Sequence, residues 1–213
     1  MKPALAAAGC ALLCGPAHAG VIDFESLPAN YSFGDVPPGA LTGLTLTDTE
    51  GVVVTISRST GAPFDIIDLS NQPRPSHWGT KALSPYADIW AHDFILFSLT
   101  PPPGKWVERV VIEFGDYGTD QGYVKIEGST GPNLTGQGWI HSMKHWSGSL
   151  ANEHGTLDSN VWSGNPVGSF LAMGEGFFQN SVFWDNIRFT VVPAPGAVGV
   201  GLVAALIWRH RRR

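Results

Sequence analysis

Cysteine is almost absent from this sequence of 213 residues, and charged residues are few. The two cysteines, Cys10 and Cys14, both lie within the first 19 residues. If that segment is removed after export, the remaining chain can form no disulfide, bind no zinc through cysteine and use no thiol nucleophile. Only 15% of the residues are charged, whereas about a quarter is usual in soluble globular proteins.

A basic surface and the common catalytic motifs are missing as well. The formal net charge of −5 excludes a nucleic-acid-binding protein that relies on a basic surface. The sequence contains no Gly-x-Ser-x-Gly elbow, no phosphate-binding loop and no dinucleotide fingerprint. Its 18 acidic residues still allow the pair of carboxylates that a glycosidase needs, so catalysis stays open with no motif to support it.

The first 19 residues have the three parts of a secretory signal peptide. Lys2 supplies the positive charge, residues 4–13 form a short apolar run, and Ala17-His18-Ala19 forms a small-residue cleavage site. We expect cleavage between Ala19 and Gly20.

The last 23 residues, 191–213, have a second three-part pattern. The motif Val192-Pro193-Ala194-Pro195 precedes residues 196–208, which are apolar or glycine throughout, and an arginine-rich end. We expect residues 196–208 to form a short transmembrane helix with the arginines on the cytoplasmic side.

This tail resembles a PEP-CTERM sorting signal, with Ala194 in place of the usual glutamate. The resemblance implies export through the inner membrane of a Gram-negative bacterium that makes exopolysaccharide. It also implies transient anchoring by the helix, processing by an exosortase (a membrane transpeptidase), and delivery to the cell surface or extracellular matrix.

The remaining domain, residues 20–190, is acidic and rich in turns. It contains all 18 acidic residues but only eight of the 13 basic ones, so its net charge is −10. This charge is compatible with divalent cations and argues against binding anionic polymers by charge attraction. Short apolar or alternating segments recur at 21–25, 44–47, 52–57, 64–69, 93–99, 106–114, 122–128, 169–173 and 181–191. They predict an all-β antiparallel β-sandwich of the jelly-roll type, and we expect 131–166 to be a loop.

The last predicted strand places a carboxylate among large apolar residues. Phe183, Asp185, Ile187 and Phe189 recur at a spacing of two, so we expect all four side chains on the core face. A buried carboxylate needs a cation, a basic partner or several hydrogen-bond donors. One alternative is that Asp185 accepts backbone N–H groups at a strand end.

The first predicted strand supplies a partner for this carboxylate. Asp23 and Glu25 share a face, and terminal strands of a sandwich often run side by side, which would bring Glu25 near Asp185. Hard oxygen ligands without cysteine favour Ca²⁺. In the acidic turn 114–120, Asp116 and Asp120 are weaker candidate ligands, or residues that only form the turn.

These motifs are similar to those of exported jelly-roll domains that precede PEP-CTERM tails. They also resemble calcium-containing carbohydrate-binding jelly rolls. The resemblance rests on residues 22–25, 114–118 and 183–187. It implies a structural Ca²⁺ held by Glu25 and Asp185.

Tryptophan is the candidate residue type for sugar binding. Trp106 and Trp184 lie in apolar strands, and we expect them to pack in the core. Four others lie among glycine, serine, asparagine and histidine, where an indole ring can stack on a sugar or close a loop over the core. These four are Trp78, Trp139, Trp146 and Trp162.

Three histidines and a glutamate lie close together in the sequence, namely His141, His145, His154 and Glu153. They match no zinc-protease spacing, and we expect solvated loop histidines.

The sequence therefore predicts an exported, non-catalytic β-sandwich that is associated with exopolysaccharide, through carbohydrate binding or matrix organisation. Two alternatives stay open, a polysaccharide hydrolase or lyase and a purely structural or adhesive surface protein.

Overall fold

In the described residues of the computed structural model the chain is all-β. These residues are 18–85, 94–116, 122–135, 138–146, 153–159, 165–176 and 182–194. Apart from the short 3₁₀ turn η2 (Pro132–Leu134), the regular elements of this part are strands. The strands are β1 (His18–Ile22), β2 (Tyr31–Ser32), β3 (Leu44–Thr47), β4 (Val53–Arg58), β5 (Asp65–Asp68), β6 (Lys81–Ser84), β7 (Ile95–Thr100), β8 (Lys105–Asp116), β9 (Gly122–Ser129), β10 (Gly138–Trp146), β11 (Glu153–Asp158), β12 (Ser169–Gly176) and β13 (Val182–Pro193).

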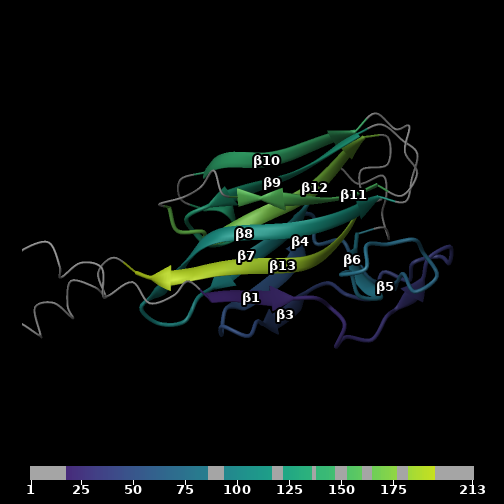
Figure 1. Cartoon of the computed structure of the whole chain (residues 1–213), viewed down its shortest axis with the longest axis horizontal. Helices are drawn as coiled ribbons and strands as arrows, with labels where there is room; N and C mark the ends of the chain where they lie inside the picture. Colours follow the sequence, from purple (N-terminus) through teal and green to yellow (C-terminus); the bar gives the residue numbers. More distant parts are fainter. Residues whose placement is uncertain are drawn as a thin grey trace, which may run out of the picture.

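The strands form two sheets (Figure 1). The seven-stranded sheet has the order β11-β8-β13-β6-β5-β2, and β1 pairs with β13. The six-stranded sheet has the order β10-β9-β12-β7-β4-β3. All pairings are antiparallel except that of β2 with β5. Because β13 pairs with β8 on one side and with β1 and β6 on the other, the last strand lies inside its sheet.

One apolar core fills the space between the sheets. In β7, buried Ile95, Phe97 and Leu99 alternate with partly exposed residues, as expected for a strand with one buried face. Phe97 stacks on Phe170 of β12, with ring centroids 4.5 Å apart and planes 3° apart. Side chains of both sheets belong to the same buried cluster, so the domain is a β-sandwich, as the sequence predicts.

Each of the nine predicted segments overlaps a strand, but the expected loop 131–166 is wrong in two places. This stretch contains β10, which pairs with β9, and β11, which pairs with β8. Both are edge strands. A strand at the edge of a sheet can consist largely of polar residues. The glycine, serine and histidine residues of this stretch therefore gave no apolar pattern from which the strands could be predicted.

The two ends of the domain lie on neighbouring strands. His18 and Ala19 of β1 pair with Val191 and Thr190, so β1 begins two residues before the expected cleavage point. At the other end β13 continues to Pro193, and the Ala194 N–H donates to the Gly104 carbonyl (2.9 Å).

Within the described residues no helix has the length and apolar character needed to cross a membrane. Residues 1–17 and 195–213, which include most of the predicted signal peptide and the whole predicted transmembrane segment, lie outside these residues.

Replacing Phe170 by alanine tests the shared core. Phe170→Ala removes the ring that stacks on Phe97 between the sheets, and we expect it to lower the free energy of unfolding by about 3–5 kcal/mol. Val36→Ala is the matched control, because Val36 is 88% exposed and its truncation should change stability by less than about 0.5 kcal/mol. Urea denaturation of the exported protein measures both values. Equal effects of the two substitutions would contradict the assignment of the core.

Candidate functional site

A β-bulge interrupts β13 directly after Asp185, at Asn186 and Ile187. Asp185 is opposite Glu113 of β8, and the next paired residue, Arg188, is opposite Val111. Two residues of β13 therefore correspond to one residue of β8 between these pairs. Asn186 takes a positive φ of 46°, a conformation that asparagine tolerates better than most residues.

The bulge reverses the alternation of side chains along the strand. Trp184 before it, Ile187 within it and Phe189 after it all belong to the core between the sheets, whereas Phe183 belongs to a second cluster. The prediction that Phe183, Asp185, Ile187 and Phe189 share one face is therefore wrong. Alternation places Asp185 with Phe183, on the face that points away from the other sheet.

The second cluster covers this outer face and buries Trp78. Its members are Tyr31, Ile67, Leu69, Trp78, Ala82 and Phe183. Trp78 is only 6% exposed, and its ring meets that of His154 edge-on, with centroids 5.0 Å apart. The prediction that Trp78 binds a sugar is therefore wrong, because its ring packs against the sheet. Trp184 is a core residue, as predicted.

Asp185 is completely buried, and its two carboxylate oxygens have no hydrogen-bond partner among the described residues. Burial, together with the negative charges of Glu25, Asp23 and Glu113, raises the pKa of this carboxyl to about 8. The nearby Asn186 amide opposes this shift without forming a hydrogen bond of normal geometry. At neutral pH this side chain therefore requires either a proton or a cation.

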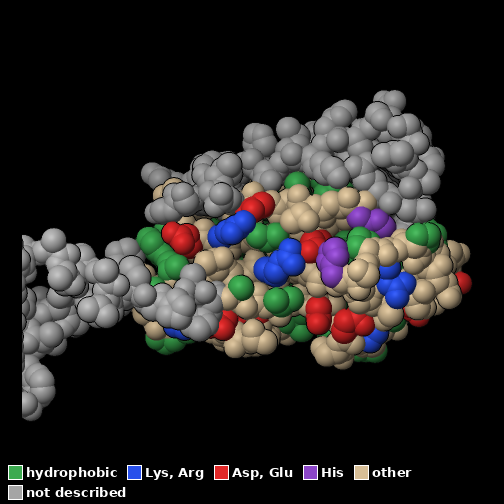
Figure 2. Space-filling view, in the orientation of Figure 1, with side chains coloured by type: hydrophobic (Ala, Val, Ile, Leu, Met, Phe, Trp, Pro, Cys, Tyr) green, Lys and Arg blue, Asp and Glu red, His purple; other side chains and the backbone are tan. Residues whose placement is uncertain are grey.

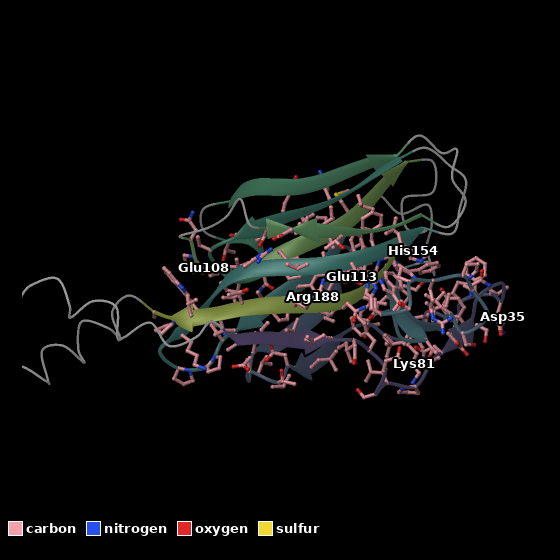
Figure 3. The ribbon with its side chains drawn as sticks, in the orientation of Figure 1. Asp35, Lys81, Glu108, Glu113, His154 and Arg188 are labelled. Carbon is pink, nitrogen blue, oxygen red and sulfur yellow. The ribbon has the colours of Figure 1, made fainter. Side chains whose placement is uncertain are left out.

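Other buried carboxylates of the domain do have partners. Asp65, also completely buried, accepts the N–H groups of Gly39 (2.9 Å) and Ala40 (2.8 Å). Glu113 is 3% exposed and accepts from Arg188 Nη2 (2.8 Å) and Asn186 Nδ2 (3.1 Å). Figure 3 shows Glu113 and Arg188 together on the adjacent strands β8 and β13.

Glu113 also contacts His77 Nε2 at 3.0 Å. Acidic, basic and histidine side chains are thus interspersed on the face formed by β8 and β13 (Figure 2). The contrast with Asp185 shows that burial of a carboxylate in this domain is ordinarily accompanied by donors.

Glu25 is held rigidly near the bulge. Its carboxylate accepts the Lys81 backbone N–H (2.7 Å) and the Thr80 hydroxyl (3.0 Å). The Lys81 ammonium donates to the Glu25 carbonyl (2.8 Å) and to that of Leu27. A Cβ on Gly79 would lie 2.0 Å from Glu25 Oε1, so glycine is needed at that position. The predicted pairing of the terminal strands is correct, and it brings the charge of Glu25 to Asp185.

Asp23 and Glu25 lie beyond the end of β1, so the predicted strand 21–25 is too long. Phe24, between them, has a φ of 58° and is buried in the core. Asp23 is exposed and accepts the Glu25 N–H (3.2 Å), which shapes the turn. The positive φ of Phe24 is incompatible with extended backbone, which explains why β1 ends at Ile22 and does not continue to Glu25.

The remaining candidate residues lie on elements whose side chains are only partly described. Asp116 ends β8, Trp139, Trp146, His141 and His145 are in β10, and His154 is in β11. The expectation that the three histidines occupy a loop is therefore wrong. Asp120, Trp162 and Pro195 lie outside the described residues.

The residues around Asp185 offer oxygen donors but no ready-made metal cage. In the described part of the chain, no three His, Cys, Asp or Glu side chains are arranged to hold a metal ion. What favours a hard cation is the combination of an unpaired buried carboxylate with a second, fixed carboxylate and a locally negative field. Main-chain carbonyls or water would have to complete six to eight oxygen ligands for Ca²⁺.

No protein-family model and no curated protein matches this sequence. The structure is similar to a DUF4465 family protein from Bacteroides caccae, at 11% identity and a TM-score of 0.47 over 81% of this chain and 98% of that one. It is similar to the K2 cleaved adhesin domain of Lys-gingipain, at 13% identity and a TM-score of 0.44 over 81% of this chain and 97% of that one. An isomalto-dextranase from Arthrobacter globiformis, complexed with panose, matches 82% of this chain with 32% of its own, at 10% identity and a TM-score of 0.38. Likenesses at this level establish neither a family nor a function.

The unpaired carboxylate predicts an unusual pH dependence. In chelator, the Asp185 carboxyl has a pKa of about 3.9 in the unfolded chain but of about 8 in the folded protein. Its favourable contribution to the free energy of unfolding is therefore fully present below about pH 4 and is lost as the pH rises to about 8. Each unit of this difference corresponds to about 1.4 kcal/mol. We expect the stability of the wild-type protein to fall across this window relative to that of Asp185→Asn. Urea denaturation at several pH values measures it, and parallel profiles for the two proteins would contradict the assignment.

Proposed function

We propose that this protein is an exported, non-catalytic jelly-roll domain that is stabilised by a structural Ca²⁺ and associated with extracellular polysaccharide. The observation that carries the calcium proposal is the completely buried Asp185 carboxylate, which has no partner among the described residues. Asp185 and Glu25 would hold the ion, with Asp23 and the end of β8 at Asp116 as further sources of oxygen ligands.

A bound cation removes the cost of this buried charge. Bringing an isolated carboxylate out of water costs several kcal/mol unless it is neutralised. A divalent ion shared with Glu25 would neutralise both carboxylates and connect the turn after β1 to the bulge in β13. The role of the ion is thus to join the two ends of the domain, and no chemical step is assigned to it.

Export is supported by the two ends of the sequence. The signal peptide would be cleaved between Ala19 and Gly20, and residues 196–208 would anchor the chain in the inner membrane of a Gram-negative bacterium. The sorting motif follows directly on the sheet, because Val192 and Pro193 are still part of β13. An exosortase would then release the domain to the cell surface or matrix.

The polysaccharide role is supported by the position of two tryptophans. Trp139 and Trp146 lie in β10, an edge strand that a polymer can reach from solvent. The competing hydrolase or lyase hypothesis needs acidic groups that reach the substrate. Asp185, whose pKa is suited to a general acid, is completely buried, so the candidate site does not support that hypothesis.

Calcium should stabilise the wild-type protein through Asp185. At a calcium concentration 100 times the dissociation constant we expect a gain of about 2.7 kcal/mol. At a fixed calcium concentration the gain should increase between pH 6 and 8, because the ion must displace a proton. Asp185→Asn should abolish this gain and Glu25→Gln should reduce it. Thermal unfolding of the exported protein in Ca²⁺ and in chelator measures the effect.

The matched control is Asp65→Asn, which alters a buried carboxylate that already has two N–H donors. It should lower stability but leave the response to calcium unchanged. An equal calcium response in wild type and Asp185→Asn would exclude the proposed site.

Binding to polysaccharide should depend on the tryptophans of β10. Exopolysaccharide from the producing strain, immobilised on beads, should retain the wild-type protein. The double variant Trp139→Ala/Trp146→Ala should bind it at least about tenfold more weakly, since each stacked ring is expected to contribute about 1 kcal/mol. Val36→Ala, on a remote exposed residue, is the control. No retention of the wild type would favour the purely structural or adhesive alternative.

A further inference from the structure

A second buried carboxylate, that of Asp48, has an oxygen without a partner. Asp48 follows β3 and is 7% exposed. Its Oδ1 accepts the N–H groups of Val52 (2.8 Å) and Glu50 (2.9 Å), which closes the turn between β3 and β4. Its Oδ2 has no hydrogen-bond partner among the described residues. The turn provides hydrogen-bond donors for Oδ1 but does not account for the burial of Oδ2.

The unpaired oxygen lies against Gly20 of β1. A Cβ on Gly20 would be 1.8 Å from Asp48 Oδ2, so no larger residue fits without moving the carboxylate. The nitrogen and a Cβ on the same Cα are about 2.5 Å apart, which places the Gly20 nitrogen within about 4.3 Å of this oxygen. Asp48 and Gly20 belong to opposite sheets, so the contact crosses the edge of the sandwich.

Gly20 is also the residue that the proposed signal cleavage would make the first of the mature chain. Hydrolysis of the Ala19–Gly20 peptide bond adds one water, giving a carboxylate on Ala19 and an α-ammonium on Gly20. The amide nitrogen, with one N–H, becomes a cation with three. A positive charge thereby appears beside Asp48 Oδ2, which has no donor among the described residues.

We propose that the α-ammonium of mature Gly20 forms an ion pair with the Asp48 carboxylate. This inference rests on the export and cleavage proposed above. Cleavage removes the pairing of His18 and Ala19 with β13, and the new ion pair fastens the shortened β1 to the turn after β3.

The α-amine itself reports on this pair. Mass spectrometry of the exported protein should show a chain that begins at Gly20. An opposite charge within 4–6 Å typically shifts a pKa by one unit or more, so the α-amine should titrate at least about one unit above its ordinary 7.7–8.0. The pKa of the α-amine is measured from the rate at which the amine is acylated as a function of pH. Asp48→Asn should return the pKa to the ordinary range.

A double-mutant cycle separates the ion pair from the role of Asp48 in the turn. An alanine inserted between Ala19 and Gly20 leaves a mature chain one residue longer, whose ammonium can no longer occupy the same place. Asp48→Asn keeps Oδ1 as an acceptor for the turn. We expect it to lower the melting temperature of the normal mature protein and to have a clearly smaller effect in the extended one.

The outcomes distinguish this inference from the export proposal. A mature chain that begins at another residue overturns both the cleavage site and the ion pair. A chain that begins at Gly20 but shows an ordinary α-amine pKa, or the same loss of melting temperature in both forms, overturns the ion pair alone.

Discussion

Two residues of β13, Asn186 and Ile187, lie where β8 offers a single residue between its paired positions, and this bulge directly after Asp185 determines the arrangement around it. It allows Trp184, Ile187 and Phe189 all to face the core despite their odd spacing. It also places the Asp185 carboxylate on the outer side of a strand that is paired along both edges, beneath the cluster that contains Trp78. The carboxylate is thus buried by the same backbone irregularity that keeps the core continuous.

The charges near the bulge are compensated unequally. Glu113 accepts from Arg188 and Asn186, and Glu25 accepts from Thr80 and the backbone of Lys81. Asp185 receives no comparable donor from the described residues, and both its burial and the negative charges of its neighbours raise its pKa. The cation that we propose, shared with Glu25, would neutralise this uncompensated charge.

The sequence predicted much of this arrangement but could not predict the bulge. Alternating apolar residues predicted the main strands. Because terminal strands of a sandwich often pair with each other, the sequence also predicted correctly that Glu25 lies near Asp185. The regular spacing of 183, 185, 187 and 189 hides the bulge, because these residues suggest one continuous face, whereas the extra residue moves Ile187 and Phe189 to the face opposite Phe183. Trp78 is buried by residues from distant parts of the chain, among them Tyr31 and Phe183, and its ring also contacts His154. Asp48 resembled an ordinary turn residue, and only its contact with Gly20 sets it apart.

Anomalous X-ray scattering from crystals of the exported protein grown with calcium can show whether a calcium ion neutralises Asp185. We expect an anomalous peak about 2.3–2.6 Å from an oxygen of Asp185, with a Glu25 oxygen in the same coordination shell. A well-ordered bulge without such a peak, with the Asp185 carboxyl hydrogen-bonded as a neutral acid, would contradict the calcium proposal.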